Sequence, residues 1–269
     1  MSDLIFELKD VSFSYLGRFL ALKDINLNIR KGEKVVIVGA NGCGKSTLLH
    51  MLDGLIFPER GVVKFLGRQL QQGDFNDDNF SRDFRRKVGL LFQNSEAQLF
   101  CPTVEEDIVF GPLQLGLDKE LIRQRYLKLV RLLGIEGISQ RPIHRLSIGE
   151  KRRAALAAVL IIEPEVILLD EPTSGLDPST SRVVVDIILQ ANAEGKTVVT
   201  ATHDMHIIEE IADRVLCLGQ EKTLVKEGPV AEIMRDRKFL QDNNLIHAHR
   251  HTHGSTVHLH PHSHLEHHS

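Results

Sequence analysis

Apolar residues in this chain fall into short runs of strand length and longer segments with helical spacing. Apolar runs and period-two alternation predict strands at residues 4–13, 25–29, 34–38, 61–67, 88–92, 166–169 and 197–201. Apolar residues that recur every three or four positions predict helices at residues 46–55, 119–133, 150–162 and near 182–193. Because strands alternate with helices, the pattern favours an α/β fold with a largely parallel sheet.

Two segments lack this periodicity. Residues 69–82 are polar, with Gly, Asn and several Asp, and are predicted to form a loop. From residue 247 to the end there are ten of the chain's fourteen histidines, together with a proline at position 261. We therefore expect a folded domain over residues 4–240 and a His-rich, disordered tail over residues 245–269.

The composition changes this picture little, because 42% apolar and 26% charged residues are ordinary for a soluble globular protein. The net charge of −3 gives no basic face, so no nucleic-acid partner is expected. No apolar run approaches the ~20 residues needed to cross a bilayer, and the amino terminus shows no secretory pattern. Three scattered cysteines without a CxxC pair suit a reducing, cytosolic compartment.

The first candidate binding site is a Gly-rich loop. Residues 39–46 read GANGCGKS and match the phosphate-binding pattern GxxxxGK[ST] between a predicted strand and a predicted helix. In that setting, backbone N–H groups curl around phosphate oxygens at a helix N-terminus. Lys45 would reach the β- and γ-phosphates of a nucleoside triphosphate, and the Ser46 hydroxyl would ligate Mg²⁺.

An acidic pair follows the predicted strand at residues 166–169. Asp170 can lie near the Mg²⁺ shell, and Glu171 can polarise an attacking water. Taken alone, Asp-Glu-Pro is better interpreted as a polar turn that closes a strand. The pair therefore gains its meaning only together with the phosphate-binding loop.

Together and in order, the motifs resemble the ATP-binding-cassette family over roughly residues 4–240. Tyr15 matches the aromatic that would stack on adenine, and Gln93 matches the glutamine that follows a strand. Residues 146–150 read LSIGE, where the family's signature is LSGGQ. Residues 174–177 (SGLD) match the dimer-contact loop, and His203 matches the switch histidine. The family implies an ATPase with a P-loop NTPase core, a mostly parallel sheet, an antiparallel β subdomain and an α-helical subdomain inserted at about 94–150. Taken singly, Tyr15 can instead be a packing residue.

The resemblance also implies a site shared between two subunits. Its catalytic residues would be Lys45, Gln93, Glu171 and His203, with Glu171 as general base or water orienter. Mg²⁺ would be held by Ser46, Gln93 and Asp170. Residues in contact with ATP would be Tyr15, Gly39, Asn41, Gly42, Cys43, Gly44, Lys45, Ser46, Thr47, Ser147, Gly149 and Asp177.

Three residues invite chemical predictions of their own. The signature has Ile148 where the family often has glycine, and Glu150 where it often has glutamine. Since isoleucine adds bulk and does not easily adopt positive φ, we predict a working but slow site. Cys43 lies near a helix N-terminus and Lys45, which predicts a lowered thiol pKa and alkylation that ATP blocks.

Residues 93–100, 102–108 and 110–112 resemble ATPases of energy-coupling-factor importers. The alternative is a generic helical subdomain. The importer resemblance implies a second ATPase subunit, identical or not, a transmembrane coupling protein, and small membrane proteins that select vitamins or metal ions. It also implies a peripheral position on the cytoplasmic face of the cell membrane.

The tail carries histidines at every second residue in two groups: His247, His249, His251 and His253, then His258, His260, His262 and His264. Neutral imidazoles bind transition metals, and within this importer group a His-rich ATPase points to the cobalt or nickel branch. One alternative is a solvated run without a role in transport. Another is a cloning scar, which residues 265–268 resemble.

Two other functions stay open at this point. One is a soluble cassette ATPase that acts on nucleic acid or ribosomes, although the chain has neither a long basic run nor a long heptad insertion. The other is a vitamin importer ATPase whose tail buffers metal ions. The sequence does not distinguish nickel from cobalt, because imidazole affinity follows a general order among these metals.

Overall fold

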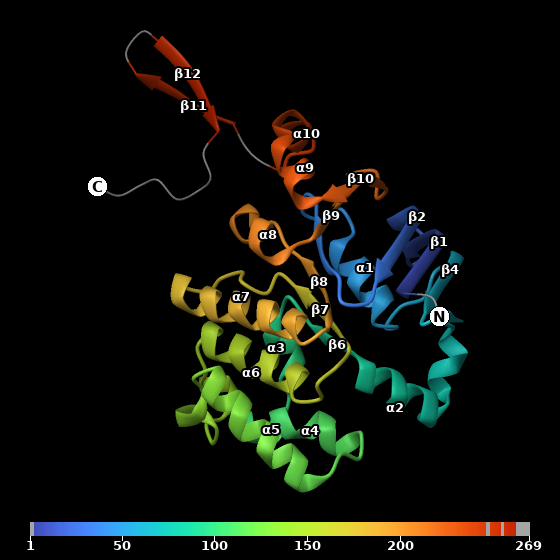
Figure 1. The fold of residues 1–269 in the computed structure, drawn as a ribbon, viewed down its shortest axis with the longest axis vertical. Helices are drawn as coiled ribbons and strands as arrows, with labels where there is room; N and C mark the ends of the chain where they lie inside the picture. The colour runs from blue at the N-terminus through green and yellow to red at the C-terminus, as the bar shows by residue number, and fades with distance from the viewer. Residues whose placement is uncertain (1–2, 246–247, 254–255, 262–269) are drawn as a thin grey trace.

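The computed structural model describes residues 3–245 and, for the backbone, residues 248–253 and 256–261. Two sheets organise the domain (Figure 1), an antiparallel one with the order β2-β1-β4-β5 and a larger one with the order β10-β9-β3-β8-β7-β6. Their strands are β1 (Leu4–Tyr15), β2 (Phe19–Arg30), β3 (Lys34–Val38), β4 (Arg60–Phe65), β5 (Arg68–Gln69), β6 (Val88–Leu91), β7 (Val166–Asp170), β8 (Thr197–Ala201), β9 (Arg214–Leu218) and β10 (Leu224–Pro229).

Helices cover the larger sheet and form a bundle beside it (Figure 1). They are α1 (Lys45–Leu52), α2 (Asp78–Lys87), α3 (Ser95–Gln98), α4 (Val104–Gln114), α5 (Lys119–Leu132), α6 (Ile148–Leu160), α7 (Pro178–Ala193), α8 (Met205–Ile211), α9 (Val230–Arg235) and α10 (Arg237–Asp242). Short 3₁₀ helices occur at Gln72–Asn76, Glu136–Ile138 and Ile143–Arg145.

The larger sheet is parallel from β6 to β9, and only β10 pairs antiparallel at its edge. Its central strands are buried along their whole length, as expected when helices or a second sheet cover both faces. The predicted P-loop fold, with a mostly parallel sheet, an antiparallel β subdomain and an inserted helical subdomain, is confirmed.

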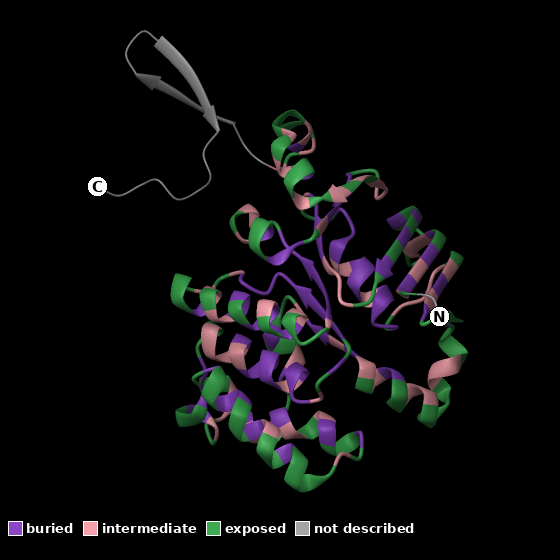
Figure 2. Cartoon of the chain, viewed as in Figure 1, coloured by how far each residue is buried: buried purple, intermediate pink, exposed green. Residues whose placement is uncertain are grey.

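The larger sheet separates two hydrophobic cores. Along β3, Val36 and Val38 face the core that contains α6 and α7, while Val35 and Ile37 face the core between the two sheets. This division follows from the period of two along a strand. Helix α1 belongs to the second core, so the segment after the phosphate-binding loop lies between the two sheets (Figure 2).

The helical subdomain expected at about residues 94–150 contains α3, α4, α5 and the start of α6, and α4 and α5 lie at one end of the molecule (Figure 1). Its longer helices start at side-chain caps, with Thr103 before α4, Asp118 before α5 and Ser147 before α6. Each cap oxygen accepts a backbone N–H that the first helical turn leaves unpaired. Polar residues therefore determine where these helices begin, and their apolar faces pack on one another and on the core.

The predicted loop at residues 69–82 is wrong in its second half, where α2 begins at residue 78. Asp77 caps this helix by accepting the N–H of Asn79. Phe80 and Phe84, four residues apart, lie on one face, and Phe84 packs edge-on against both Phe65 and Phe75. The polar composition of the segment hid this aromatic face.

Disorder of the His-rich tail stays a prediction, and the structure describes only part of the tail backbone. That part forms an antiparallel hairpin of β11 (Ala248–His253) and β12 (Thr256–Pro261). A strand needs only an extended chain with a period of two, and the His-x-His alternation supplies that period. Residues 246–247, 254–255 and 262–269 lie outside the described residues.

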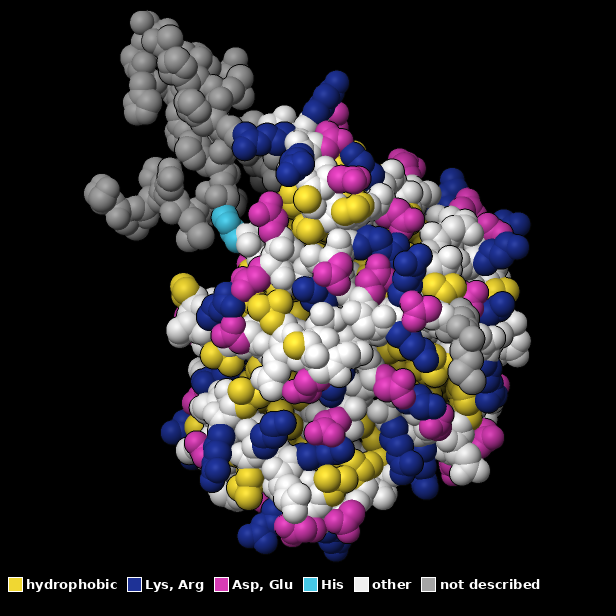
Figure 3. Space-filling view, viewed as in Figure 1, with side chains coloured by type: hydrophobic (Ala, Val, Ile, Leu, Met, Phe, Trp, Pro, Cys, Tyr) yellow, Lys and Arg dark blue, Asp and Glu magenta, His cyan; other side chains and the backbone are white. Residues whose placement is uncertain are grey.

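Lys and Arg side chains are interspersed with Asp and Glu side chains over the face seen in Figure 3. This mixture follows from 33 bases against 36 acids. A surface of mixed sign does not produce the single-sign field that steers a highly charged partner.

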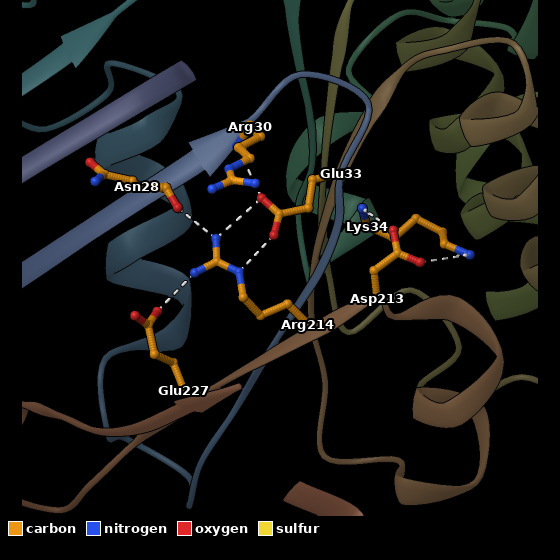
Figure 4. A network of polar contacts seen from close by, with 7 residues as sticks. All are labelled: Asn28, Arg30, Glu33, Lys34, Asp213, Arg214 and Glu227. Atoms are coloured by element: carbon orange, nitrogen blue, oxygen red, sulfur yellow. Dashed lines mark hydrogen bonds and ion pairs between the residues drawn. The ribbon is translucent and has the colours of Figure 1, made fainter. Parts of the chain in front are cut away.

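A polar network ties the two sheets together at the amino-terminal end of β3 and β9 (Figure 4). The Arg214 guanidinium donates to Glu33 Oε1 at 2.6 Å, to Glu227 Oε2 at 2.8 Å and to the Asn28 carbonyl at 2.5 Å. Beside it, the backbone N–H of Lys34 donates to Asp213 Oδ2 at 3.0 Å. One half-buried guanidinium on β9 thus joins β2 and the β2–β3 turn to the larger sheet and also bonds to its edge strand, β10.

Replacement of this guanidinium is expected to destabilise the fold. Arg214→Met should lower the free energy of unfolding by about 2 kcal/mol, because the partly buried Glu33 carboxylate loses its guanidinium partner. Urea denaturation followed by circular dichroism measures this change. Arg131→Met is the control, since Arg131 makes only an exposed ion pair with Glu136 and its loss should cost about 0.5 kcal/mol or less. Equal losses in the two variants would contradict the structural role of Arg214.

Candidate active site

Three neighbouring strands of the larger sheet deliver the candidate residues to one edge. The loop at residues 39–44 follows β3, Glu171 follows β7, and His203 comes two residues after β8. Because the strands are parallel and lie in the order β3-β8-β7, their carboxyl ends meet at the same edge. Ligands of open α/β sheets bind at this edge.

Close packing around the phosphate-binding loop requires two of its glycines. At Gly44, where φ is +114°, a Cβ would come within 2.4 Å of the Ala21 carbonyl oxygen on β2. At Gly39 a Cβ would come within 2.6 Å of the Leu218 carbonyl oxygen at the end of β9. The loop is therefore held between β2 and β9, and a side chain at either glycine would displace it.

A buried carboxylate lies at the centre of the site. Glu171 is only 4% exposed, and its Oε2 lies 2.8 Å from Nδ1 of His203. Its Oε1 lies 3.9 Å from Nζ of Lys45, which also donates to the Gly39 carbonyl at 2.9 Å. The structure thus brings together Lys45, Glu171 and His203, three residues that the sequence predicted as catalytic.

Asp170 provides the expected place for a cation. Burial raises the pKa of its carboxyl group, and the Ser46 hydroxyl hydrogen-bonds to it. Among the described residues, Asp170 Oδ1 is a buried side-chain oxygen without a hydrogen-bond partner. A hydroxyl beside a buried carboxylate oxygen with free acceptor capacity is an oxygen donor set that Mg²⁺ accepts. Ser46 and Asp170 therefore fit the predicted Mg²⁺ ligands.

Gln93 faces the same space. A cleft of about 640 Å³ lies between the core and the helical subdomain, and its lining includes Ser46, Gln93, Asp170, Ile148 and Ser174. Gln93 itself is exposed and follows β6 by two residues. Its amide can therefore reach into a cleft that both parts of the molecule line.

Comparison with known proteins agrees with this geometry. A model of the ABC transporter family matches residues 22–174. The chain belongs to the ABC transporter family. The nickel import ATP-binding protein NikO of Rhodobacter capsulatus is 43% identical over 244 residues, which cover 90% of this chain and 95% of that protein. The energy-coupling factor transporter ATP-binding protein EcfA of Methanothermobacter thermautotrophicus is 41% identical over 239 residues, covering 89% and 75%.

Among solved structures, cbiO1 from Clostridium perfringens, described as part of the ABC transporter complex cbiONQ, has a TM-score of 0.75. It is 33% identical, and the match covers 91% of this chain and 96% of that one. The resemblance to ATP-binding-cassette proteins of the energy-coupling-factor kind is confirmed, and so is ATP hydrolysis as the activity.

In this ABC ATPase the signature residues form the start of α6. Ser147 caps the helix by accepting the N–H of Glu150, and Glu150 Oε2 accepts the N–H of Ser147 at 2.8 Å. The acidic residue at position 150 thus completes a capping box. Gly149 is the second residue of the helix, and Ser147 is exposed.

The expectation that position 148 needs a positive φ, which isoleucine does not easily adopt, is wrong. Ile148 is the first residue of α6, so its φ is not among the positive values, and its side chain is 67% exposed. Isoleucine is permitted at a helical φ, and its bulk meets solvent and the cleft rather than the backbone. No strain at Ile148 supports the prediction of a slow site.

Tyr15 and Asp177, two further residues predicted to contact ATP, lie on different parts of the chain. The Tyr15 hydroxyl lies 3.3 Å from Thr47 Oγ1, so the half-exposed ring stands beside the start of α1. Asp177 caps α7, and hydrogen bonds from Ser179 and Thr180 lower the pKa of its carboxyl group. Asp177 is exposed and lies on the loop that the sequence assigned to dimer contact.

The tail histidines are placed only in part. Within the hairpin, His249 pairs with His260 and His251 pairs with His258, and His253 ends β11. Directly paired residues and residues two apart share one face of a ribbon. His247, His262 and His264 lie outside the described residues.

Sequence reasoning missed three residues at the site. The ring of His50, on α1, lies 5.6 Å from that of Phe92, and His50 lines the cleft with Asp170. Lys222, in the β9–β10 turn, donates to the Gly42 carbonyl at 2.7 Å. Arg152 donates to the Glu171 carbonyl at 3.0 Å. Only the position of His50, four residues after Ser46 on one helix face, was visible in the sequence.

The prediction of a lowered thiol pKa at Cys43 is wrong. Its side chain is 1% exposed, and burial raises the pKa of its thiol despite the nearby Lys45 and Lys222. A raised pKa leaves less of the reactive thiolate at neutral pH. The sequence showed the cations but not the packing of Cys43 in the core between the two sheets.

Alkylation should therefore spare Cys43. N-ethylmaleimide at neutral pH is expected to modify the partly exposed Cys101 at least about tenfold faster than Cys43, with or without ATP. Peptide mass spectrometry over a time course measures both rates, and labelling in urea provides the unfolded reference. Faster labelling of Cys43 than of Cys101, with protection by ATP, would show that the thiol is reactive after all.

Proposed function

We propose that this chain is the ATP-hydrolysing subunit of an energy-coupling-factor importer for cobalt or nickel ions. The observation that carries the ATPase site is the buried Glu171 carboxylate between Lys45 and His203 at the phosphate-binding loop. The import of a metal ion is supported by the similarity to a protein named a nickel import ATP-binding protein and to cbiO1 of the cbiONQ complex.

Each site residue would have its own role in the hydrolysis of ATP. The loop at residues 39–46 would hold the phosphates through backbone N–H groups, and Tyr15 would stack on the adenine. Glu171 would accept the proton of the attacking water, while His203 contacts the γ-phosphate. Bound Mg²⁺ would neutralise phosphate charge, held by Ser46, Asp170 and Gln93.

The exposure of Ser147, at the start of the signature helix, and of two other predicted site residues supports a site shared between two subunits. Ser147 and Asp177 are exposed although both sit on helix caps, and the His203 side chain is exposed as well. Lys45, Asp170 and Glu171 are buried. A second ATPase subunit, identical or not, would bring its Ser147 and Gly149 over the phosphates, with Asp177 at the contact.

An apolar surface on the helical subdomain supports a membrane partner. Phe100 is 68% exposed and meets Phe110 edge-on at a ring distance of 5.0 Å, and Leu113 on the same helix is exposed. Exposed aromatic pairs of this kind mark protein contacts. Their partner would be the transmembrane coupling protein, which works with small membrane proteins that bind the substrate.

Within residues 3–245 and the hairpin, no helix is long and apolar enough to span a membrane. We propose a peripheral position on the cytoplasmic face of the cell membrane, with attachment through the coupling protein. The exposed aromatic pair of the helical subdomain supports this position.

The first test replaces the carboxylate. Glu171→Gln should lower kcat for ATP hydrolysis at least about 100-fold while ATP still binds, because glutamine keeps the size of the side chain but cannot accept the proton. In cells that carry the native membrane subunits, uptake of labelled Ni²⁺ or Co²⁺ should be lost in parallel. Loss of uptake of either ion names the substrate.

Glu165→Gln is the matched control, since Glu165 is an exposed glutamate just before the same strand. It should leave hydrolysis and uptake unchanged. Normal uptake of both ions in Glu171→Gln cells, at normal protein levels, would rule out the metal importer and favour a vitamin importer or a soluble ATPase.

For the tail, we propose a transition-metal site on one face of the hairpin. The backbone brings His249 opposite His260 and His251 opposite His258. Four imidazole-bearing positions on one face of a ribbon suit Ni²⁺, Co²⁺, Zn²⁺ or Cu²⁺.

Replacement of those four histidines by asparagine should abolish high-affinity binding of Ni²⁺ and Co²⁺ by the full chain, measured by equilibrium dialysis. ATP hydrolysis should be unchanged, because the residues assigned to the phosphate site all lie between Tyr15 and Lys222. The control replaces the exposed His144 and His206 of the folded domain, which should leave metal binding intact. Undiminished binding in the tail variant would overturn the proposal.

A further inference from the structure

Arg152 is a buried cation that no part of the hydrolysis scheme above uses. It lies on α6 and is only 3% exposed. Its guanidinium donates to the Phe92 carbonyl at 2.7 Å and to the Glu171 carbonyl at 3.0 Å. A buried guanidinium is costly unless its donors are satisfied, so both contacts must persist for the residue to be tolerated.

One of these contacts acts on a strained residue. Glu171 has φ of +48°, which an L-residue with a long side chain rarely adopts. Its N–H donates to the Ala201 carbonyl at 2.8 Å, and its own carbonyl also accepts the N–H of Ser174 at 3.2 Å. Strained backbone at a functional residue persists only where the surroundings fix it. Arg152 adds a side-chain donor to these two backbone hydrogen bonds.

The other contact reaches the glutamine loop. The Phe92 carbonyl belongs to the residue directly before Gln93. Lys151, the neighbour of Arg152, forms an ion pair with Glu96 a few residues farther along. The helix that begins at the signature residue Ser147 therefore holds the glutamine loop and the Glu171 backbone through consecutive side chains. A helix transmits a displacement along its axis as a rigid element.

We infer that Arg152 is a positioning residue for hydrolysis. It fixes the Glu171 backbone, and with it the direction of the carboxylate, and it makes this position depend on the docking of α6 against the glutamine loop. A partner subunit that contacts Ser147 and a membrane subunit that displaces the glutamine loop then act on the same guanidinium. The inference rests on the proposed role of Glu171 as the proton acceptor.

The test separates positioning from ATP binding. Arg152→Met keeps the length of the side chain but removes its donors. It should lower kcat by about tenfold or more and leave KM for ATP within about threefold, because Arg152 contacts the Glu171 backbone and not the phosphate-binding loop. Arg152→Lys, which can reach one carbonyl, should give an intermediate kcat. Arg153→Met is the matched control, since Arg153 bonds only to the carbonyls of Leu133, Gly134 and Gly149 in the helical subdomain.

Rates are normalised to the fraction of protein that binds ATP, so that loss of folded protein does not count as loss of turnover. If Arg152→Met does not fold, Arg152→Lys decides the question by the same split between kcat and KM. Wild-type kcat in both Arg152 variants, or a loss no greater than that of Arg153→Met, would overturn the inference. Glu171→Gln is measured in parallel: full activity in that variant would refute the role of Glu171, whereas inactivity with an active Arg152→Met would refute only the role of Arg152.

Discussion

The burial of the Glu171 carboxylate is the constraint on which the rest of the site depends. Removal of a carboxylate from water costs several kcal/mol unless cations and hydrogen bonds compensate for it. Lys45 Nζ at 3.9 Å and His203 Nδ1 at 2.8 Å provide that compensation from two other strand ends. The site therefore requires β3, β7 and β8 to be neighbours, and the parallel sheet with its two separate cores is the arrangement that makes them so.

The sequence predicted this part of the site because its residues directly follow apolar strands. A run such as residues 166–170 defines both the strand and the edge at which Glu171 emerges. The contacts of Arg152 and Lys222 could not be predicted in the same way, since each donates to a backbone carbonyl. Every residue has such a carbonyl, so the sequence carries no mark of which one will be the acceptor until the chain is folded.

The wrong predictions each come from a local rule applied without the structure around the residue. Cys43 has the neighbouring cations that lower a thiol pKa, but burial between two sheets has the larger effect. Ile148 replaces a glycine, but its backbone is helical and places no demand for positive φ. Residues 69–82 are polar, yet Phe75, Phe80 and Phe84 pack on one another, and Phe84 packs on Phe65 of β4. At Cys43 and in residues 69–82 tertiary contacts overruled the local pattern, whereas at Ile148 the helical backbone did.

The division of the site between buried and exposed residues explains why hydrolysis would await a partner. Lys45, Asp170 and Glu171 are buried and already held by contacts within one chain. Ser147, Asp177 and His203 are exposed. Ser147 and Asp177 cap helices, yet the Ser147 hydroxyl and the Asp177 carboxylate can still form hydrogen bonds at the surface. A phosphate held by one chain alone would thus lie open to water on one side, where screening weakens every charge that acts on it. Closure by a second subunit would remove that water, and α6 extends from the signature residues to the backbone of Glu171, the proposed proton acceptor.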